Sequence, residues 1–109
     1  MLHPKFNEVC KIFKEYFPDA FLIVATNCQY NIGEGRPLRE RFQDALQYID
    51  LLYFSIDGYD KSYERDRSPA KWSRLLSFLG DFKEMDRRGC RVTCNYVVNP
   101  QNVSDIQRV

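Results

Sequence analysis

Three short apolar runs alternate along the chain with three segments of helical spacing, and this order limits the folds that the chain can adopt. The runs AFLIVATN, LLYFSIDG and CRVTCNYVV are rich in β-branched and aromatic residues, which favour buried strands. We expect strands near residues 21–27, 51–57 and 91–98. Strands that alternate with helices pair in parallel through right-handed crossovers. The sequence therefore predicts an α/β fold made of three parallel β/α units.

Apolar residues recur every three or four positions in the segments that flank these runs. This spacing predicts helices over residues 6–17, 38–49 and 68–89. A fourth helix is expected to begin with Ser104 or Asp105 as its cap. The stretch GYDKSYERDR, between the second strand and the third helix, is expected to be a loop.

The length allows one domain at most over residues 1–109, and the order of elements is that of a segment of a larger repeating β/α domain. A hydrophobic content of 44% is ample for a packed core, and a net charge of +1 without a basic block does not indicate nucleic acid or an anionic membrane as partner. No run is long enough to span a bilayer, and the N-terminus lacks a secretory signal pattern. A cytoplasmic protein is expected, with its four cysteines as reduced thiols and no disulfides.

Polar residues gather toward the carboxyl end of each expected strand. One such residue is often an ordinary turn former, but three strand ends in register are equally consistent with a ligand site. Because side chains alternate along a strand, one face of the second and third strands should be polar and the other apolar. The polar strand-end residues are Thr26 and Asn27, Ser55 and Asp57, and Asn95 and Asn99.

These residues carry a resemblance to the core domain of radical S-adenosylmethionine (radical SAM) enzymes. LHPKF resembles the stretch after the family's Gly-Gly-Glu-Pro motif, and ATN resembles the end of its third strand. FSIDG resembles the fourth strand with the ribose motif, and VTCNYVVNPQN resembles the fifth. FSIDG followed by YERDR is the most specific element. The resemblance implies three units of a (β/α)6 partial TIM-like barrel, with S-adenosylmethionine (SAM) across the carboxyl ends of the strands.

The resemblance implies cofactor-binding roles at the first two strand ends. Ser55 would hydrogen-bond the ribose or the amino-acid part of SAM, and Asp57 would support that strand end. Thr26 and Asn27 match the usual TN ending of the family. Cys28 departs from the pattern because the family commonly has glycine there.

Two further cofactor contacts follow from the resemblance. Arg67 falls in the loop after the ribose strand, where a guanidinium can grip the methionine carboxylate of SAM. Arg65 could equally be the aligned residue. Asn95 matches a polar position on the fifth strand that faces the cofactor or the substrate.

The family's chemistry also needs three cysteines at Cys-x3-Cys-x2-Cys spacing, which hold a [4Fe-4S] cluster whose open iron binds and cleaves SAM. The 109 residues contain no such motif. Cys90 and Cys94 would lie on one face of a strand about 13 Å apart, too far to share an iron, so we expect both to be buried packing residues. Cys10 falls on the apolar stripe of a helix and Cys28 in a loop, and no metal ligand set is expected.

Three functional hypotheses follow. In the first, the chain is the central part of a radical SAM enzyme, which cannot cleave SAM alone because the cluster ligands are absent. The missing part of the barrel, or self-association, would then cover its exposed apolar edges. The second is a non-enzymatic binding or interaction module that retains half of such a barrel, and the third is a small doubly wound α/β domain that binds a nucleotide. The residues present do not identify a substrate.

Overall fold

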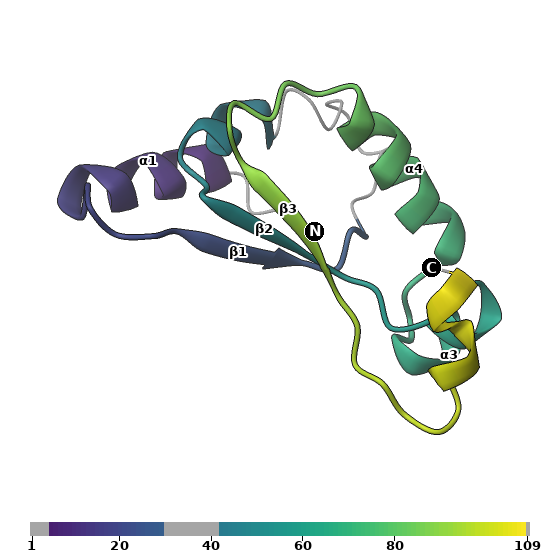
Figure 1. Ribbon diagram of the computed structural model, residues 1–109. Helices are drawn as coiled ribbons and strands as arrows, with labels where there is room; N and C mark the ends of the chain where they lie inside the picture. The colour runs from purple at the N-terminus through teal and green to yellow at the C-terminus, as the bar shows by residue number, and fades with distance from the viewer. Residues whose placement is uncertain (1–4, 30–41, 109) are drawn as a thin grey trace.

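The computed structural model describes residues 5–29 and 42–108 (Figure 1). Three strands form one parallel sheet in the order β1-β2-β3, so the predicted α/β class with three parallel strands is confirmed. The elements in chain order are α1 (Phe6–Tyr16), β1 (Ile23–Thr26), the 3-10 helix η1 (Gln43–Gln47), β2 (Leu51–Ser55), α3 (Lys61–Asp66), α4 (Trp72–Lys83), β3 (Arg91–Asn95) and the 3-10 helix η2 (Val103–Arg108).

Each strand lies inside its predicted range but is shorter than predicted. The Ile56 amide still donates to the Asn95 carbonyl at 3.0 Å, but beyond it side chains replace the backbone ladder between the continuations of β2 and β3. For example, the Val97 amide donates to the Asp57 carboxylate at 2.9 Å instead of extending the ladder. The Asp57 side chain therefore joins the segment after β2 to the segment after β3.

The helix predicted over residues 68–89 is α4, which begins later and ends earlier. Its N-terminal boundary is set by Lys71, whose extended backbone (φ −117°, ψ 130°) separates α4 from the preceding turn. Side chains from other segments bond the backbone amides there: Glu64 accepts from the Trp72 amide at 3.1 Å, and Gln29 from the Lys71 amide at 2.7 Å. The stretch GYDKSYERDR was expected to be a loop, but Lys61–Asp66 within it forms α3.

Two other helix predictions need correction. Within the predicted helix 38–49, the described part contains η1, and residues 38–41 lie outside the described residues. Ser104 and Asp105 were expected to cap the last helix, but both lie inside η2, which begins at Val103. The Asn99 side chain instead accepts from the amide of Asn102 at 2.9 Å, just before η2.

A chain of aromatic rings joins the sheet to the helices. Phe54 of β2 contacts Phe78 and Phe82 of α4, with ring centroids 5.4 and 5.2 Å apart. Phe82 reaches Phe42 at 6.4 Å, and Phe42 stacks on Phe6 of α1 at 5.3 Å. Aromatic pairs at these separations add to the hydrophobic stabilisation of the core. Helix α4 is thus packed on the sheet face that carries Phe54, and Phe42 connects α1 to it.

The opposite face of the sheet has no such cover among the described residues. Tyr53 and Ser55 are only partly buried, and Ile23 is 50% exposed. In the register, Tyr53 and Ser55 pair with Thr93 and Asn95 of β3, and paired residues of a parallel sheet share a face. The predicted alternation is confirmed for β2, whereas in β3 Cys94 of the opposite face is exposed as well. We call the surface with Tyr53 and Ser55 the open face.

Beyond the carboxyl ends of the strands lie α3 and η2 (Figure 1). Within the part of the chain that the structure describes, no helix is long and apolar enough to cross a bilayer.

Candidate functional site at the carboxyl ends of the strands

The turn after β2 depends on a glycine. A Cβ atom at Gly58 would lie 2.6 Å from the backbone nitrogen of Tyr63 and 2.7 Å from Oγ of Ser62. Real Cβ atoms essentially never approach other atoms so closely. The first turn of α3 can therefore pack directly against the end of β2 only because this residue has no side chain.

Asp57 joins three segments at this end of the sheet. Its Oδ2 pairs with Nη1 of Arg67, which directly follows α3, and its Oδ1 accepts from the Val97 amide at 2.9 Å. Its backbone carbonyl accepts from Nδ2 of Asn102 at 2.9 Å. The Asp57 side chain is 13% exposed, so these contacts replace most of its hydration. Both carboxylate oxygens are occupied by protein donors.

Asn102 is the buried centre of the same network. Its Nδ2 donates to the carbonyls of Asp57 and Val97, both at 2.9 Å, and its Oδ1 accepts from the Asn99 amide at 2.7 Å. A buried amide must find partners for both ends, and this one does. Sequence reasoning did not single out Asn102, although the turn-forming stretch NPQN was a signal for it.

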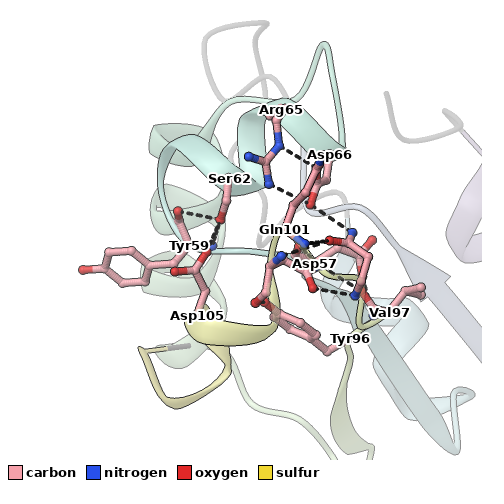
Figure 2. Close-up of polar contacts among 11 residues, drawn as sticks. Asp57, Tyr59, Ser62, Arg65, Asp66, Tyr96, Val97, Gln101 and Asp105 are labelled. Carbon is pink, nitrogen blue, oxygen red and sulfur yellow. Dashed lines mark hydrogen bonds and ion pairs between the residues drawn. The ribbon is translucent and has the colours of Figure 1, made fainter.

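A second cluster links the start of α3 to η2. Ser62 accepts from the Tyr59 amide at 2.9 Å, and its hydroxyl donates to Oδ2 of Asp105 at 2.5 Å (Figure 2). Since Ser62 and Asp105 are 43 residues apart in the sequence, this contact also fixes the segment after β3 against the segment after β2.

Asp66, the last residue of α3, is the third polar centre. It accepts from Nε of Arg65 at 2.9 Å and from Nδ2 of Asn99 at 3.3 Å. The hydrogen bond from Arg65 lowers the pKa of Asp66, and the same bond raises the pKa of Arg65. Arg65 is thus held by its neighbour and is not among the residues that line the cavity described below.

A cavity of about 440 Å³ lies between the loop after β1 and the turn from α3 to α4. Its walls are held together by Gln29, whose Nε2 donates to the Tyr63 hydroxyl at 2.8 Å and to the Lys71 carbonyl at 3.0 Å. Burial raises the pKa of the Tyr63 hydroxyl, which donates in turn to the Asn27 carbonyl at 3.3 Å. The polar lining comes from Asn27, Gln29, Asp66, Arg67, Ser68 and Arg74.

The six residues expected to bind the cofactor fall into separate places. Ser55 and Asn95 are register partners on the open face. Asn27 and Arg67 line the cavity. Asp57 connects the two places, because it pairs with Arg67 and bonds the segment that follows Asn95.

Thr26 lies apart from the others. Its register partner is Phe54, so it belongs to the packed face, and it is 8% exposed. Its Oγ1 accepts from the Cys28 amide at 3.1 Å, which shapes the end of β1. The structure therefore does not bring Thr26 to the open face with Ser55.

The cysteines do not form a cluster site. Cys10, Cys28 and Cys90 are buried, and burial raises the pKa of Cys10 to about 11 and that of Cys28 to about 12. Cys94 is exposed, so its expected role as a buried packing residue is wrong: β3 is an edge strand of the described sheet. Among the described residues, no group of three or more His, Cys, Asp or Glu side chains is placed to hold a metal ion. These residues do not fit a [4Fe-4S] cluster.

Comparisons of the chain with protein-family models, with curated proteins and with solved structures give no match. The functional interpretation therefore depends on the geometry described above.

Proposed function

We propose that the chain binds SAM at the carboxyl ends of its strands, as three units of a partial (β/α) barrel in a radical SAM enzyme. The observation that carries the proposal is the pairing of Ser55 with Asn95 on the open face, next to the Asp57–Arg67 ion pair. A hydroxyl, an amide and a guanidinium are donors and acceptors suited to ribose hydroxyls and a carboxylate.

The layering of the elements supports a barrel unit. In a (β/α) barrel the strands follow one another in order, the helices lie outside, and the opposite sheet face lines the interior. Here the order is β1-β2-β3, and the contacts of Phe54 place α4 on one face. A doubly wound domain would need helices on both faces. The geometry thus favours the barrel interpretation over the small nucleotide-binding domain.

The backbone at Cys28 is a second support. The resemblance has glycine at this position, and Cys28 adopts a φ of 59°, in the left-handed region that glycine enters without cost. Cys28 thus adopts a backbone conformation that favours glycine, the residue that the resemblance has at this position. The Cys28 side chain is buried and packs in the core.

Arg67 retains capacity for a ligand. Its Nη1 is engaged by Asp57, whereas none of the described residues accepts from its Nε or Nη2. Its side chain is 27% exposed and lines the cavity. In the proposed complex, Asp57 orients the guanidinium, and the remaining nitrogens bind the methionine carboxylate of SAM.

Reductive cleavage of SAM requires the [4Fe-4S] cluster, and the cysteines of this chain do not fit one. The proposal therefore assigns to these residues the binding and orientation of SAM, with the cluster ligands supplied by another part of the protein. The exposed thiol of Cys94 is consistent with a reducing compartment, and we propose a cytoplasmic location.

The interaction-module hypothesis has one observation in its favour. Val9, Ile12 and Tyr16 are 49% to 76% exposed and follow one side of α1. Such a stripe normally packs against another element. In the barrel proposal the rest of the barrel covers it, and in the alternative a separate protein does.

Titration with SAM, followed by amide NMR shifts, tests the proposal. We expect weak binding, with the largest shifts at Ser55 and Asn95, and we expect Ser55→Ala to weaken the binding severalfold. Ser77→Ala, which removes an exposed hydroxyl from α4, is the matched control and should leave binding unchanged. If Ser55→Ala binds as well as the unmodified chain, or the shifts fall elsewhere, the SAM site is not on the open face.

A further inference from the structure

The cavity between the loop after β1 and the α3–α4 turn has an unusual balance of hydrogen-bonding groups. Its amide and carboxylate oxygens already accept from protein donors. Oε1 of Gln29 accepts from the Lys71 amide at 2.7 Å, Oδ1 of Asn27 accepts from the Gln29 amide at 3.1 Å, and Asp66 accepts from Arg65. A ligand that offers donors would therefore find few partners here.

Apart from the Gln29 amide, which donates to Tyr63 and Lys71, the side-chain donors of the same cavity keep hydrogen-bonding capacity within the described part of the chain. Among the described residues, none accepts from Nδ2 of Asn27, from the Ser68 hydroxyl or from the guanidinium of Arg74. Arg67 uses one of its nitrogens for Asp57 and keeps the others. The cavity thus presents two guanidinium groups and two neutral donors, and it favours a ligand that carries several acceptor oxygens.

Arg74 also stands at an electrostatically unfavourable place. It lies in the first turn of α4, where the helix dipole is positive, and that turn contains no acidic residue. Glu64 bonds the Trp72 amide nearby, but it does not line the cavity. The dipole and Arg74 are thus both positive at this wall, and a bound anion would offset them. The two nearby carboxylates, Asp57 and Asp66, are each already paired with an arginine.

We propose that this cavity is a binding site for a small anion with carboxylate or phosphate oxygens, held by Arg67 and Arg74 together. A volume of about 440 Å³ exceeds what a single ion needs and lies in the range of small-molecule sites. The site goes beyond the SAM proposal. SAM carries a net positive charge from its sulfonium and ammonium groups, whereas the two arginines favour a ligand of net negative charge. The ligand is therefore a molecule other than SAM, and because both would use the remaining nitrogens of Arg67, the two ligands compete for this arginine.

Isothermal titration of the purified chain with pyrophosphate and with citrate, at low ionic strength and pH 7, tests this site. We expect saturable binding of at least one probe, and the preferred probe distinguishes phosphate from carboxylate oxygens. Arg74→Ala should weaken the binding about tenfold or more, because a charge-assisted hydrogen bond and a nearby charge are both lost. The affinity of Arg74→Lys should lie between those of the unmodified chain and Arg74→Ala, since an ammonium keeps the charge without the planar fork.

Arg87→Ala is the matched control. Arg87 lies with Arg88 and Arg91 around a different basic surface before β3, so its removal changes net charge equally but leaves the cavity intact. We expect less than about a twofold change for this variant. Equal weakening by Arg74→Ala and Arg87→Ala would show only non-specific attraction and would overturn the site, as would the absence of saturable binding up to about 10 mM of either probe.

Two cross-tests separate this inference from the SAM proposal. Ser55→Ala should leave anion binding unchanged, and Arg74→Ala should leave the SAM-induced amide shifts at Ser55 and Asn95 unchanged. If neither variant nor the unmodified chain binds an anion, the anion site is rejected, whatever happens to SAM binding. Anion binding lost only in Arg74→Ala would establish it even if SAM does not bind.

Discussion

Asn102 lies 45 residues after Asp57, yet its side-chain amide donates to the Asp57 carbonyl at 2.9 Å. The contact closes the loop after β3 onto the end of β2. Because Asp57 also holds Arg67, the wall of the cavity and the end of the open face are parts of one network.

Asn102→Ala should destabilise the chain by about 3 kcal/mol, because it leaves the carbonyls of Asp57 and Val97 and the Asn99 amide without their partner. Urea denaturation measures the change. Gln101→Ala, which alters an exposed neighbour, should stay within about 0.5 kcal/mol. Similar losses in the two variants would show that the buried amide is not the cause.

Gly58→Ala should cost about 2 kcal/mol or more, because the added Cβ would overlap backbone atoms of Ser62 and Tyr63. Gly80→Ala is the internal control. A Cβ at Gly80 meets nothing within 4 Å, so alanine should stabilise α4 by about 0.5–1 kcal/mol. Thermal unfolding of both variants checks the opposite signs, and a stabilised Gly58→Ala chain would contradict the packing of α3 on β2.

Asp50 should make stability depend on acid pH. Lys14 and the Leu22 amide, both 2.7 Å from Oδ2, hold the pKa of Asp50 below its usual value of 3.8. A carboxyl group with a lowered folded-state pKa contributes stability above its unfolded pKa and loses it as pH falls through the folded pKa. Asp50→Asn should therefore destabilise at pH 7 and much less at pH 2.5, as measured by urea denaturation.

Asp44→Asn, at an exposed aspartate of η1, is the comparison for that experiment. We expect it to change stability little at either pH. A stability loss from Asp50→Asn that is the same at both pH values would show that the charge of Asp50 is not involved.

Cys94 should be the thiol that reacts first in the folded chain. It is exposed, whereas Cys10, Cys28 and Cys90 are buried. Burial raises the pKa of all four thiols, to about 11 for Cys10 and about 12 for Cys28, so solvent access, and not the fraction of thiolate, sets Cys94 apart. Reaction with an aromatic disulfide reagent should modify one thiol rapidly, and Cys94→Ser should remove that phase. A fast phase that survives in Cys94→Ser would place the accessible thiol elsewhere.

The strands could be predicted because the residues within each strand determine which side chains face the core. Alternation in LLYFS placed Leu52 and Phe54 on the packed face and Tyr53 and Ser55 on the open face, as observed. Helix ends were predicted less well, because distant side chains decide them: Gln29 is 42 residues from Lys71, whose amide it bonds.

The candidate site was predictable only in part for the same reason. Strand-end polarity led to Ser55 and Asn95, which the register brings together. It also included Thr26, whose face depends on a register that the residue types alone do not give. The free donors of Ser68 and Arg74 become visible only when the acceptors of the cavity are traced to their partners.

The parallel sheet, covered on one face, could be extended by further strands at its edges. Within the described residues, β1 and β3 each have one unpaired edge, and all the strands run in the same direction. A further strand and helix could join either edge in the same orientation without reversing the polarity of any existing contact. Growth by duplication of one unit is therefore compatible with this architecture, and each added unit would extend both surfaces of the sheet while leaving the existing ring contacts in place.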